Sequence, residues 1–298
     1  MDTNGAKPEF PKLLADNLWL LGNYFFNLYL VRGRKASALI EAGISATVDT
    51  VITQLEELQI TPDYLVLTHP HSDHFTGLPG LRERFPRAAI ITGSGAREFV
   101  QHPKAAGMII AEDRFMSQQL AARGIVPGRP PLQHVEFPLN HAVVEHEMVI
   151  DLGDLSLVCL QVKGHSPGNI VVHLPQMQVL ILSDSLGFHF PGREFCPLFF
   201  TGYADYMETL DRLAVLKPKI IGPAHQGPLF DAQARDAMTR ARQDAKDLQS
   251  RIVKAHDQGE DIRGRLFEEF YKDEFKLYSP ANIEGCVQLL VRRALEAA

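Results

Sequence analysis

One short stretch of the chain concentrates side chains that can bind metal ions. THPHSDHFTG, residues 68–77, places His69, His71, Asp73 and His74 within six consecutive positions. His69 and His71 are two residues apart just after a predicted strand, where alternate side chains point the same way, so both imidazoles can reach one point. Asp73 and His74 begin the next predicted helix and can face a second point nearby. The stretch therefore supplies half of the ligands for two adjacent metal sites.

Three further metal-capable side chains follow later predicted strands, one at a time. KGHSPGN contains His165, SDSLG contains Asp184, and GPAHQGP contains His225. Taken singly, a histidine after a strand is usually a solvated loop residue, and an aspartate there is usually a turn former. Four such segments in this order are hard to explain by chance. The pattern therefore predicts a complete site for two metals.

The segments that must position these side chains are short apolar runs first and long helical patterns last. Strands are expected at 18–21, 25–31, 36–40, 64–67, 155–162, 170–174, 179–182 and 219–221, with helices at 48–58 and 203–216. The strand at 64–67 runs directly into the histidine cluster. Residues 97–123 are mostly helical in composition and are followed by the proline-rich loop GIVPGRPP, which indicates an insertion between strands. From residue 231 onward nearly the whole chain has helical patterning.

Composition and charge limit the class of protein. The chain has 298 residues and a formal net charge of -6, which argues against general nucleic-acid binding because that relies on clustered Lys and Arg. No apolar run approaches the roughly 20 residues of a membrane span. The N-terminus lacks the apolar core of a secretory signal, and the three cysteines form no CxxC pair. We therefore expect a cytoplasmic protein with no nucleic-acid partner and no membrane association.

The order HxHxDH followed by single His, Asp and His residues resembles the metallo-β-lactamase superfamily. The resemblance covers residues 18–230 and implies an α/β fold, an αββα sandwich with the site at the edges of the sheets. It implies a metallo-β-lactamase-fold domain at 1–230 with a helical insertion at about 94–130. Residues 231–298 would then be a helical C-terminal extension that roofs the site.

The resemblance also implies how two divalent metal ions are held. The implied ligands are His69, His71 and His165 for the first metal, Asp73, His74 and His225 for the second, and Asp184 as a bridge between both. Five imidazoles and two carboxylates suit zinc or iron, with manganese as a further option. Such a centre can hold a metal-bridging hydroxide at neutral pH, and this hydroxide can attack a carbonyl carbon.

Individual residue types separate the branches of the superfamily. Asp184 stands where true β-lactamases commonly have a cysteine, and His71 stands at the middle position of a motif that resembles HxExD in flavodiiron oxidoreductases. RNA-processing relatives keep the same ligands, so only the acidic charge balance and the lack of a basic appendage argue against them. A hydrolase is the branch that remains.

A closer resemblance begins after the bridging aspartate. DSLGFHF, CPLFFTGYADYMETLDRLAVLKPKIIGPAHQG and the segment EAGIS at 41–45 resemble the quinolone-signal response thioesterases, the PqsE-like proteins. This resemblance implies an ester or thioester substrate. Phe188 lies where those proteins carry an acidic residue near the metals, which implies a different substrate pocket.

The predicted function is a dinuclear metal-dependent hydrolase of a small-molecule ester or thioester, above all an acyl thioester. Asp73 and His189 are the candidate catalytic residues; His189 lies five residues beyond Asp184 and is the candidate general acid. The phenylalanines between 188 and 200 suggest an apolar wall for an acyl or aromatic group. Two alternatives stay open: a metal-containing regulatory protein with vestigial activity whose helical tail binds a partner, and an RNA or phosphodiester hydrolase. A homodimer is one option for the oligomeric state.

Overall fold

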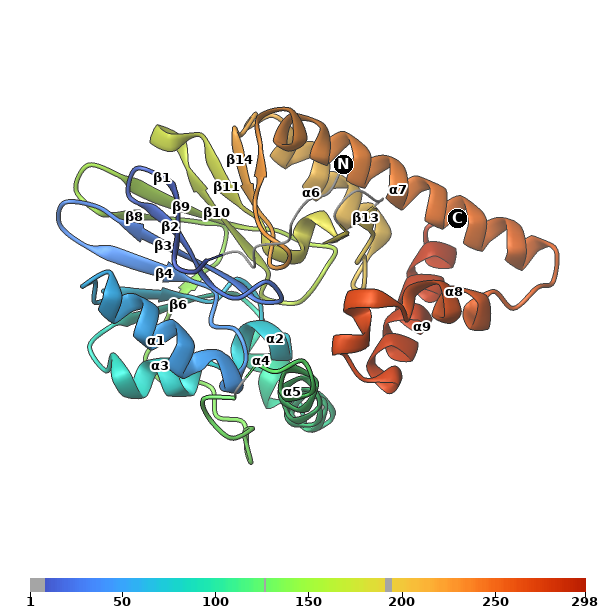
Figure 1. The fold of residues 1–298 in the computed structure, drawn as a ribbon. Helices are drawn as coiled ribbons and strands as arrows, with labels where there is room; N and C mark the ends of the chain where they lie inside the picture. The colour runs from blue at the N-terminus through green and yellow to red at the C-terminus, as the bar shows by residue number, and fades with distance from the viewer. Residues whose placement is uncertain (1–8, 126, 191–194) are drawn as a thin grey trace, which may run out of the picture.

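The computed structural model describes residues 9–125, 127–190 and 195–298. Within them, two β-sheets pack face to face with helices on both outer faces, as Figure 1 shows. The seven-stranded sheet has the order β1-β2-β3-β4-β5-β6-β7, and the six-stranded sheet has the order β15-β14-β11-β10-β9-β8. The predicted αββα sandwich is therefore confirmed.

The strands are short, and those of the first sheet are consecutive in the chain. They are β1 (Lys12–Ala15), β2 (Leu18–Gly22), β3 (Asn27–Arg32), β4 (Ser37–Ile40), β5 (Tyr64–Val66), β6 (Ala89–Gly93) and β7 (Ala142–Val144). The second sheet contains β8 (Glu147–Asp151), β9 (Ser156–Gln161), β10 (Ile170–Leu174), β11 (Val179–Ile181), β14 (Ile220–Gly222) and β15 (Leu229–Phe230). β12 (Phe188–His189) and β13 (Phe195–Cys196) pair antiparallel in a separate two-stranded sheet.

The sandwich has three apolar layers because its central strands are buried on both faces. In β3, Leu28 and Leu30 pack toward the outer helices, whereas Tyr29 and Val31 pack between the sheets. This alternation is what a strand produces, since successive side chains point to opposite faces. Strands of this kind have continuous apolar sequences, which is why the sequence predicts them well.

Amphipathic helices cover the outer face of each sheet. The first sheet is covered by α1 (Val48–Glu57) and α3 (Leu78–Arg84), and the second by α6 (Tyr203–Ala214) and α7 (Asp231–Asp257). The apolar stripe of each helix closes an outer layer; Val51 and Leu55 of α1 are fully buried, as is Leu213 of α6. These helices leave free the edge where the strands end and the predicted ligands lie.

The sequence prediction places no strand between 67 and 155, where the structure has three: β6, β7 and β8. β7 and β8 lie at the edges of their sheets, and most of their positions are exposed although most of their residues are apolar. Both strands are short, and their apolar residues are consecutive, so their sequences lack the alternation that marks a half-buried strand. The strand expected at 25–31 begins at Asn27 instead, because the Asn23 side chain accepts hydrogen bonds from the backbone of Phe25 and Phe26 in a turn.

Further helices lie at the edge of the sandwich where the predicted ligands converge. They are α2 (Ser72–Phe75), α4 (Ala96–Gln101), α5 (Pro103–Ala122), α8 (Arg263–Phe270), the 3-10 helix η4 (Asp273–Leu277) and α9 (Pro280–Glu296). In Figure 1 the C-terminal helices, orange to red, lie beside the sandwich at the end near α2, α4 and α5. An apolar cluster joins these parts: Met116 and Leu120 of α5 pack with Phe275, Tyr278 and Ile283.

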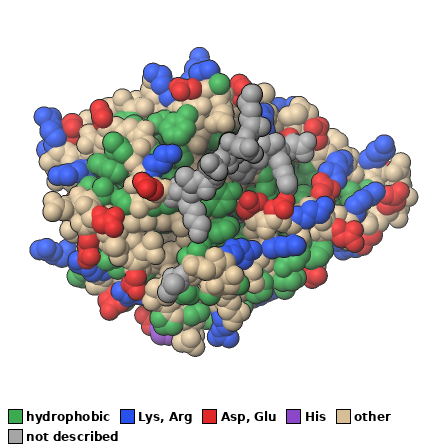
Figure 2. Space-filling model, in the orientation of Figure 1, with side chains coloured by type: hydrophobic (Ala, Val, Ile, Leu, Met, Phe, Trp, Pro, Cys, Tyr) green, Lys and Arg blue, Asp and Glu red, His purple; other side chains and the backbone are tan. Residues whose placement is uncertain are grey.

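The surface is mixed in charge. Figure 2 shows acidic and basic side chains interspersed over the face that it presents, with no broad basic region on that face. Among the described residues, every helix is too short or too polar to cross a lipid bilayer.

Candidate metal centre

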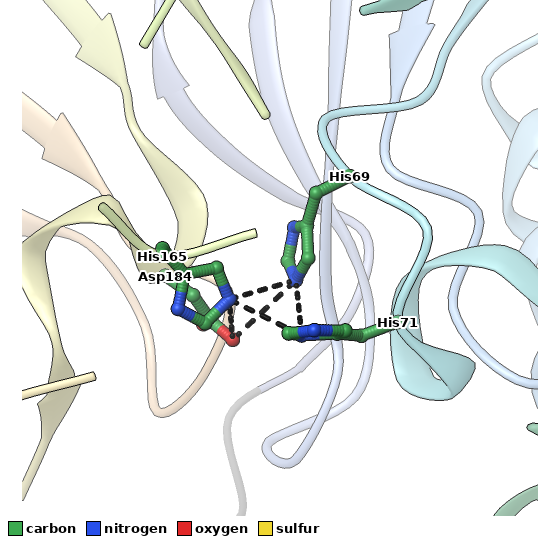
Figure 3. A group of neighbouring side chains, drawn as sticks. All are labelled: His69, His71, His165 and Asp184. Atoms are coloured by element: carbon green, nitrogen blue, oxygen red, sulfur yellow. Dashed lines mark hydrogen bonds and ion pairs between the residues drawn. The ribbon is translucent and has the colours of Figure 1, made fainter. Parts of the chain in front are cut away.

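The first cluster consists of three histidines and one aspartate that point toward one another (Figure 3). Nε2 of His69 lies 3.1 Å from Nδ1 of His71, and Nε2 of His165 lies 3.2 Å from both of these atoms. Oδ2 of Asp184 lies 3.7 Å from Nε2 of His69 and 3.6 Å from Nε2 of His165. Ligand nitrogens around a tetrahedral zinc ion lie about 3.3 Å apart, since each bond is about 2.0–2.1 Å. The spacing fits one cation.

The second cluster shares Asp184 with the first. Nε2 of His74 lies 3.2 Å from Oδ2 of Asp73 and 3.4 Å from Oδ2 of Asp184. Nε2 of His225 lies 3.5 Å from Oδ2 of Asp73 and 3.5 Å from Oδ1 of Asp184. The four side chains are buried and offer ligand atoms within 4.8 Å of one another. The structure thus brings all seven predicted ligand residues into two adjoining groups suited to a dinuclear metal site.

Two of these histidines are oriented by backbone carbonyls. Nδ1 of His165 lies 2.9 Å from the carbonyl oxygen of Leu198, and Nδ1 of His225 lies 2.6 Å from that of Phe25. A carbonyl oxygen can only accept, so Nδ1 carries the proton in both rings and Nε2 keeps its lone pair for the cluster. In metal sites, a ligand histidine typically donates a hydrogen bond from the ring nitrogen that does not bind the metal.

A buried carboxylate plays the same part for His74. Nδ1 of His74 lies 3.0 Å from Oε2 of Glu41, whose Oε1 accepts a 2.7 Å hydrogen bond from the Thr68 hydroxyl. The Thr68 oxygen in turn lies 3.1 Å from Nδ1 of His69. Nε2 of His74 is buried without a hydrogen-bond partner of its own among the described residues. A buried nitrogen whose lone pair faces two carboxylates fits a cation between them.

Local backbone geometry presents these side chains. Glu41 follows β4 with a positive φ of 78°, a conformation that side chains rarely adopt and that tends to occur at functional sites. Gly164, at φ 100°, precedes His165; a Cβ there would lie 2.3 Å from the Cα of Tyr206, so only glycine allows this approach. Both positions therefore serve the placement of a neighbouring ligand residue.

Electrostatics differ between the two clusters: the pKa values of the imidazoles are lowered in the first and raised in the second. Burial, followed by the neighbouring histidines, lowers the pKa of His69, and burial also lowers the pKa of His165. The pKa of His71 falls to about 3, chiefly through burial. Burial alone would raise the pKa of Asp73 and Asp184, but His74 and His225 outweigh it and both pKa values are lowered. Burial alone would lower the pKa of His74 and His225, but the neighbouring carboxylates outweigh it and both pKa values are raised. A metal at the second cluster would therefore displace protons from these rings, since neutral imidazoles and carboxylates are the forms that bind metals.

A cavity of about 610 Å³ opens above the two clusters. Its polar floor contains His71, Asp73, His165 and Asp184. Its apolar walls come from both sides: Phe99, Met108 and Ile109 of α4 and α5, Ile283 and Leu289 of α9, and Phe188, Leu198, Phe200 and Phe275 between them. Lys104 and Arg292 also line it. A ligand in this cavity would meet the metals at one end and apolar side chains along its length.

Tyr278, which no sequence pattern singled out, reaches the second cluster. Its hydroxyl donates a 2.8 Å hydrogen bond to Oδ2 of Asp73 and lies 3.4 Å from Nε2 of His225. The ring of Phe188 stacks on His225, with centroids 4.8 Å apart, so an aromatic side chain covers this side of the cluster. No local signal could have identified Tyr278; Glu41 was flagged only by its place in EAGIS.

The structure does not bring His189 to the cavity. It is not among the lining residues, and its ring packs on Phe195 with centroids 5.1 Å apart. Phe188 and His189 are successive residues of β12, so their side chains point to opposite faces, and Phe188 occupies the face toward His225 of the second cluster. Of the predicted phenylalanine wall, Phe188 and Phe200 line the cavity.

Comparison with known proteins agrees with this geometry. The family model of the metallo-beta-lactamase superfamily matches residues 22–225, and the chain belongs to this superfamily. That range contains both clusters.

Several characterised relatives are similar over most of the chain. It is 28% identical over 254 residues to a hydroxyacylglutathione hydrolase of Parasynechococcus marenigrum, covering 80% of this chain and 84% of that protein. It is 25% identical over 227 residues to the acyl-coenzyme A thioesterase MBLAC2 of Bos taurus, covering 69% and 75%. The crystal structure of ST1585 from Sulfolobus tokodaii superposes with a TM-score of 0.58 at 22% identity, covering 94% and 98%.

Proposed function

We propose that this protein is a dinuclear metal-dependent hydrolase that cleaves an ester or thioester, with an acyl thioester as the preferred substrate. The observation that carries the proposal is the pair of histidine and aspartate clusters that share Asp184 at the floor of an apolar cavity. Two relatives named above are thioester hydrolases by name, which supports the substrate class.

The residues divide into two ligand groups in this proposal. They are His69, His71 and His165 for one metal, Asp73, His74 and His225 for the other, and Asp184 for both. When bound, two divalent cations polarise a carbonyl oxygen and make water nucleophilic at neutral pH. Zinc or iron suits this donor set, with manganese as a further option.

The protein itself fixes the geometry and excludes water. Glu41 and the backbone carbonyls hold the imidazoles so that their free nitrogens converge. Asp184, shared by the two clusters, and Asp73 in the second cluster supply two negative charges that would reduce the repulsion between two cations. Apolar side chains of α5 and α9 would surround the acyl group and keep bulk water from the reacting carbonyl.

The cavity favours an acyl chain or aromatic group attached to an anionic carrier. Met108 and Leu289 are 45% and 37% exposed and lie on opposite walls of the cavity, α5 and α9. Lys104 and Arg292 supply positive charge to the same cavity. A thioester suits such a site because its thiolate leaves without a dedicated general acid, and His189, the general acid expected from the sequence, does not line the cavity.

The test is hydrolysis of a substrate panel by the metal-loaded protein. Aromatic and medium-chain acyl-coenzyme A, a glutathione thioester, a lactone and a phosphodiester would be compared, with and without a chelator. Chelator-sensitive cleavage of an acyl thioester supports the proposal. Faster cleavage of the phosphodiester would replace it with the RNA-processing alternative.

Finer features stay predictions. The relatives named above are not quinolone-signal response proteins, so that resemblance rests on the sequence segments alone. The cytoplasmic location, the homodimer, the extent of the C-terminal extension and a partner-binding role for its helices are likewise proposals to be tested.

A further inference from the structure

The hydroxyl of Tyr278 lies inside the second cluster although it belongs to the C-terminal part of the chain. It donates to Oδ2 of Asp73 at 2.8 Å across a separation of 205 residues, and its side chain is buried. The hydroxyl oxygen of Tyr278 also lies 3.4 Å from Nε2 of His225. This is close to the 3.5 Å between Nε2 of His225 and Oδ2 of Asp73. Tyr278 is therefore as near to two candidate ligands as they are to each other.

A hydrogen bond to a carboxylate is stronger than one between neutral groups, because the acceptor is charged. Here it fixes one oxygen of Asp73 and restricts rotation of the carboxylate. A ligand whose orientation is set before the metal arrives loses less conformational freedom when the metal binds.

The next residue anchors Tyr278 to the insertion helix. The backbone N–H of Ser279 donates to Oε2 of Glu112 at 3.1 Å, and the Ser279 hydroxyl donates to Oε1 of the same carboxylate. The Ser279 hydroxyl also accepts from the backbone N–H of Asn282 and caps α9. Glu112 is itself buried on α5, so Tyr278 is held between two helices that line the cavity.

We propose that Tyr278 is a positioning residue of the metal centre: its hydroxyl holds Asp73 ready for the metal shared with His74 and His225. The inference rests on the proposed dinuclear function and extends it, because it makes retention of one metal depend on the docking of α9 against α5 through Glu112 and Ser279. A tyrosine that merely fills the core would contribute through its ring and not through its hydroxyl.

The test is zinc binding by the full-length Tyr278→Phe variant, which keeps the ring and removes the hydroxyl. Metal-stripped protein would be titrated with zinc against a chromophoric chelator, which resolves the two binding steps. We expect one step to weaken by about tenfold or more, the loss typical when a group that orients a metal ligand is removed, while the other step stays as in the wild type.

Tyr271→Phe is the matched control, since Tyr271 precedes the same segment but stacks on Phe267, with centroids 5.2 Å apart, and does not line the cavity. It should bind zinc like the wild type. A second variant, Glu112→Gln, weakens the anchor of Ser279 and should weaken the same step. It decides the question if Tyr278→Phe does not fold.

Two results would overturn the inference, and they differ. If the wild type binds two zinc ions and both variants bind them with unchanged affinity, Tyr278 only packs, and the proposed hydrolase stands. If the wild type binds no zinc, both the proposed dinuclear centre and the proposed role of Tyr278 are wrong.

Discussion

Glu41 and His74 form a buried pair in which Oε2 of the carboxylate lies 3.0 Å from Nδ1 of the imidazole. The negative charge orients the ring and makes its other nitrogen a better ligand. Glu41→Gln keeps the shape and removes the charge, so zinc affinity at the site that contains His74 should fall by about 10–100-fold. Competition titration of the metal-stripped protein measures this. Glu57→Gln, on the exposed face of α1, is the control; equal affinities for the two variants would contradict the role of Glu41.

Metal content is the most direct check of the two clusters. Because each cluster offers three or more ligand atoms around one point, protein expressed with ample zinc and iron should hold about two transition-metal ions per chain. Elemental analysis by mass spectrometry measures the ratio. A reproducible value near zero would remove the dinuclear centre.

Asp184 belongs to both clusters, so its charge acts on both metal positions. Asp184→Asn removes one negative charge between two cations, which increases their repulsion and should reduce occupancy to about one metal per chain. Turnover should fall by orders of magnitude, while circular dichroism stays unchanged. Asp236→Asn, at an exposed position of α7, should behave like the wild type. Full metal content with undiminished turnover in Asp184→Asn would refute the bridging role.

The apolar walls of the cavity make a prediction about the acyl group. Leu289→Asp places a charge on the α9 wall at a position that is already 37% exposed, so the fold should tolerate it. KM should rise several-fold for a medium-chain acyl thioester and less for an acetyl thioester, with metal content unchanged. A KM that rises equally for both substrates would show that Leu289 does not contact the acyl chain.

The sequence predicted which side chains converge because each of them follows a strand. His165 and Asp184 end up beside His69, since strand ends of a sandwich meet at one edge, and the fold brings them there without further information. The apolar runs of β3, β5 and β10 are strong signals for the same reason: these strands are buried on both faces.

Contacts between distant helices were not predictable in this way. Tyr278 meets Asp73 through a docking of α9 on the sandwich that no local pattern encodes, and helical spacing alone does not show which face of α5 will line a cavity. His189 failed as a cavity residue for the opposite reason. Its position after Asp184 was suggestive, but the pleat of β12 turns Phe188 toward the second cluster instead.

The superfamily match ends at residue 225, whereas one wall of the cavity is built by α9, residues 280–296. The candidate metal ligands and this one wall of the cavity therefore lie in separate stretches of the chain. Under the proposed function, substitutions on the cavity face of α9 would change the acyl group that is accepted without replacing a metal ligand. The same separation offers a practical route to engineered variants: a library confined to the exposed turns of α9 would explore new substrates while every member keeps the same metal ligands.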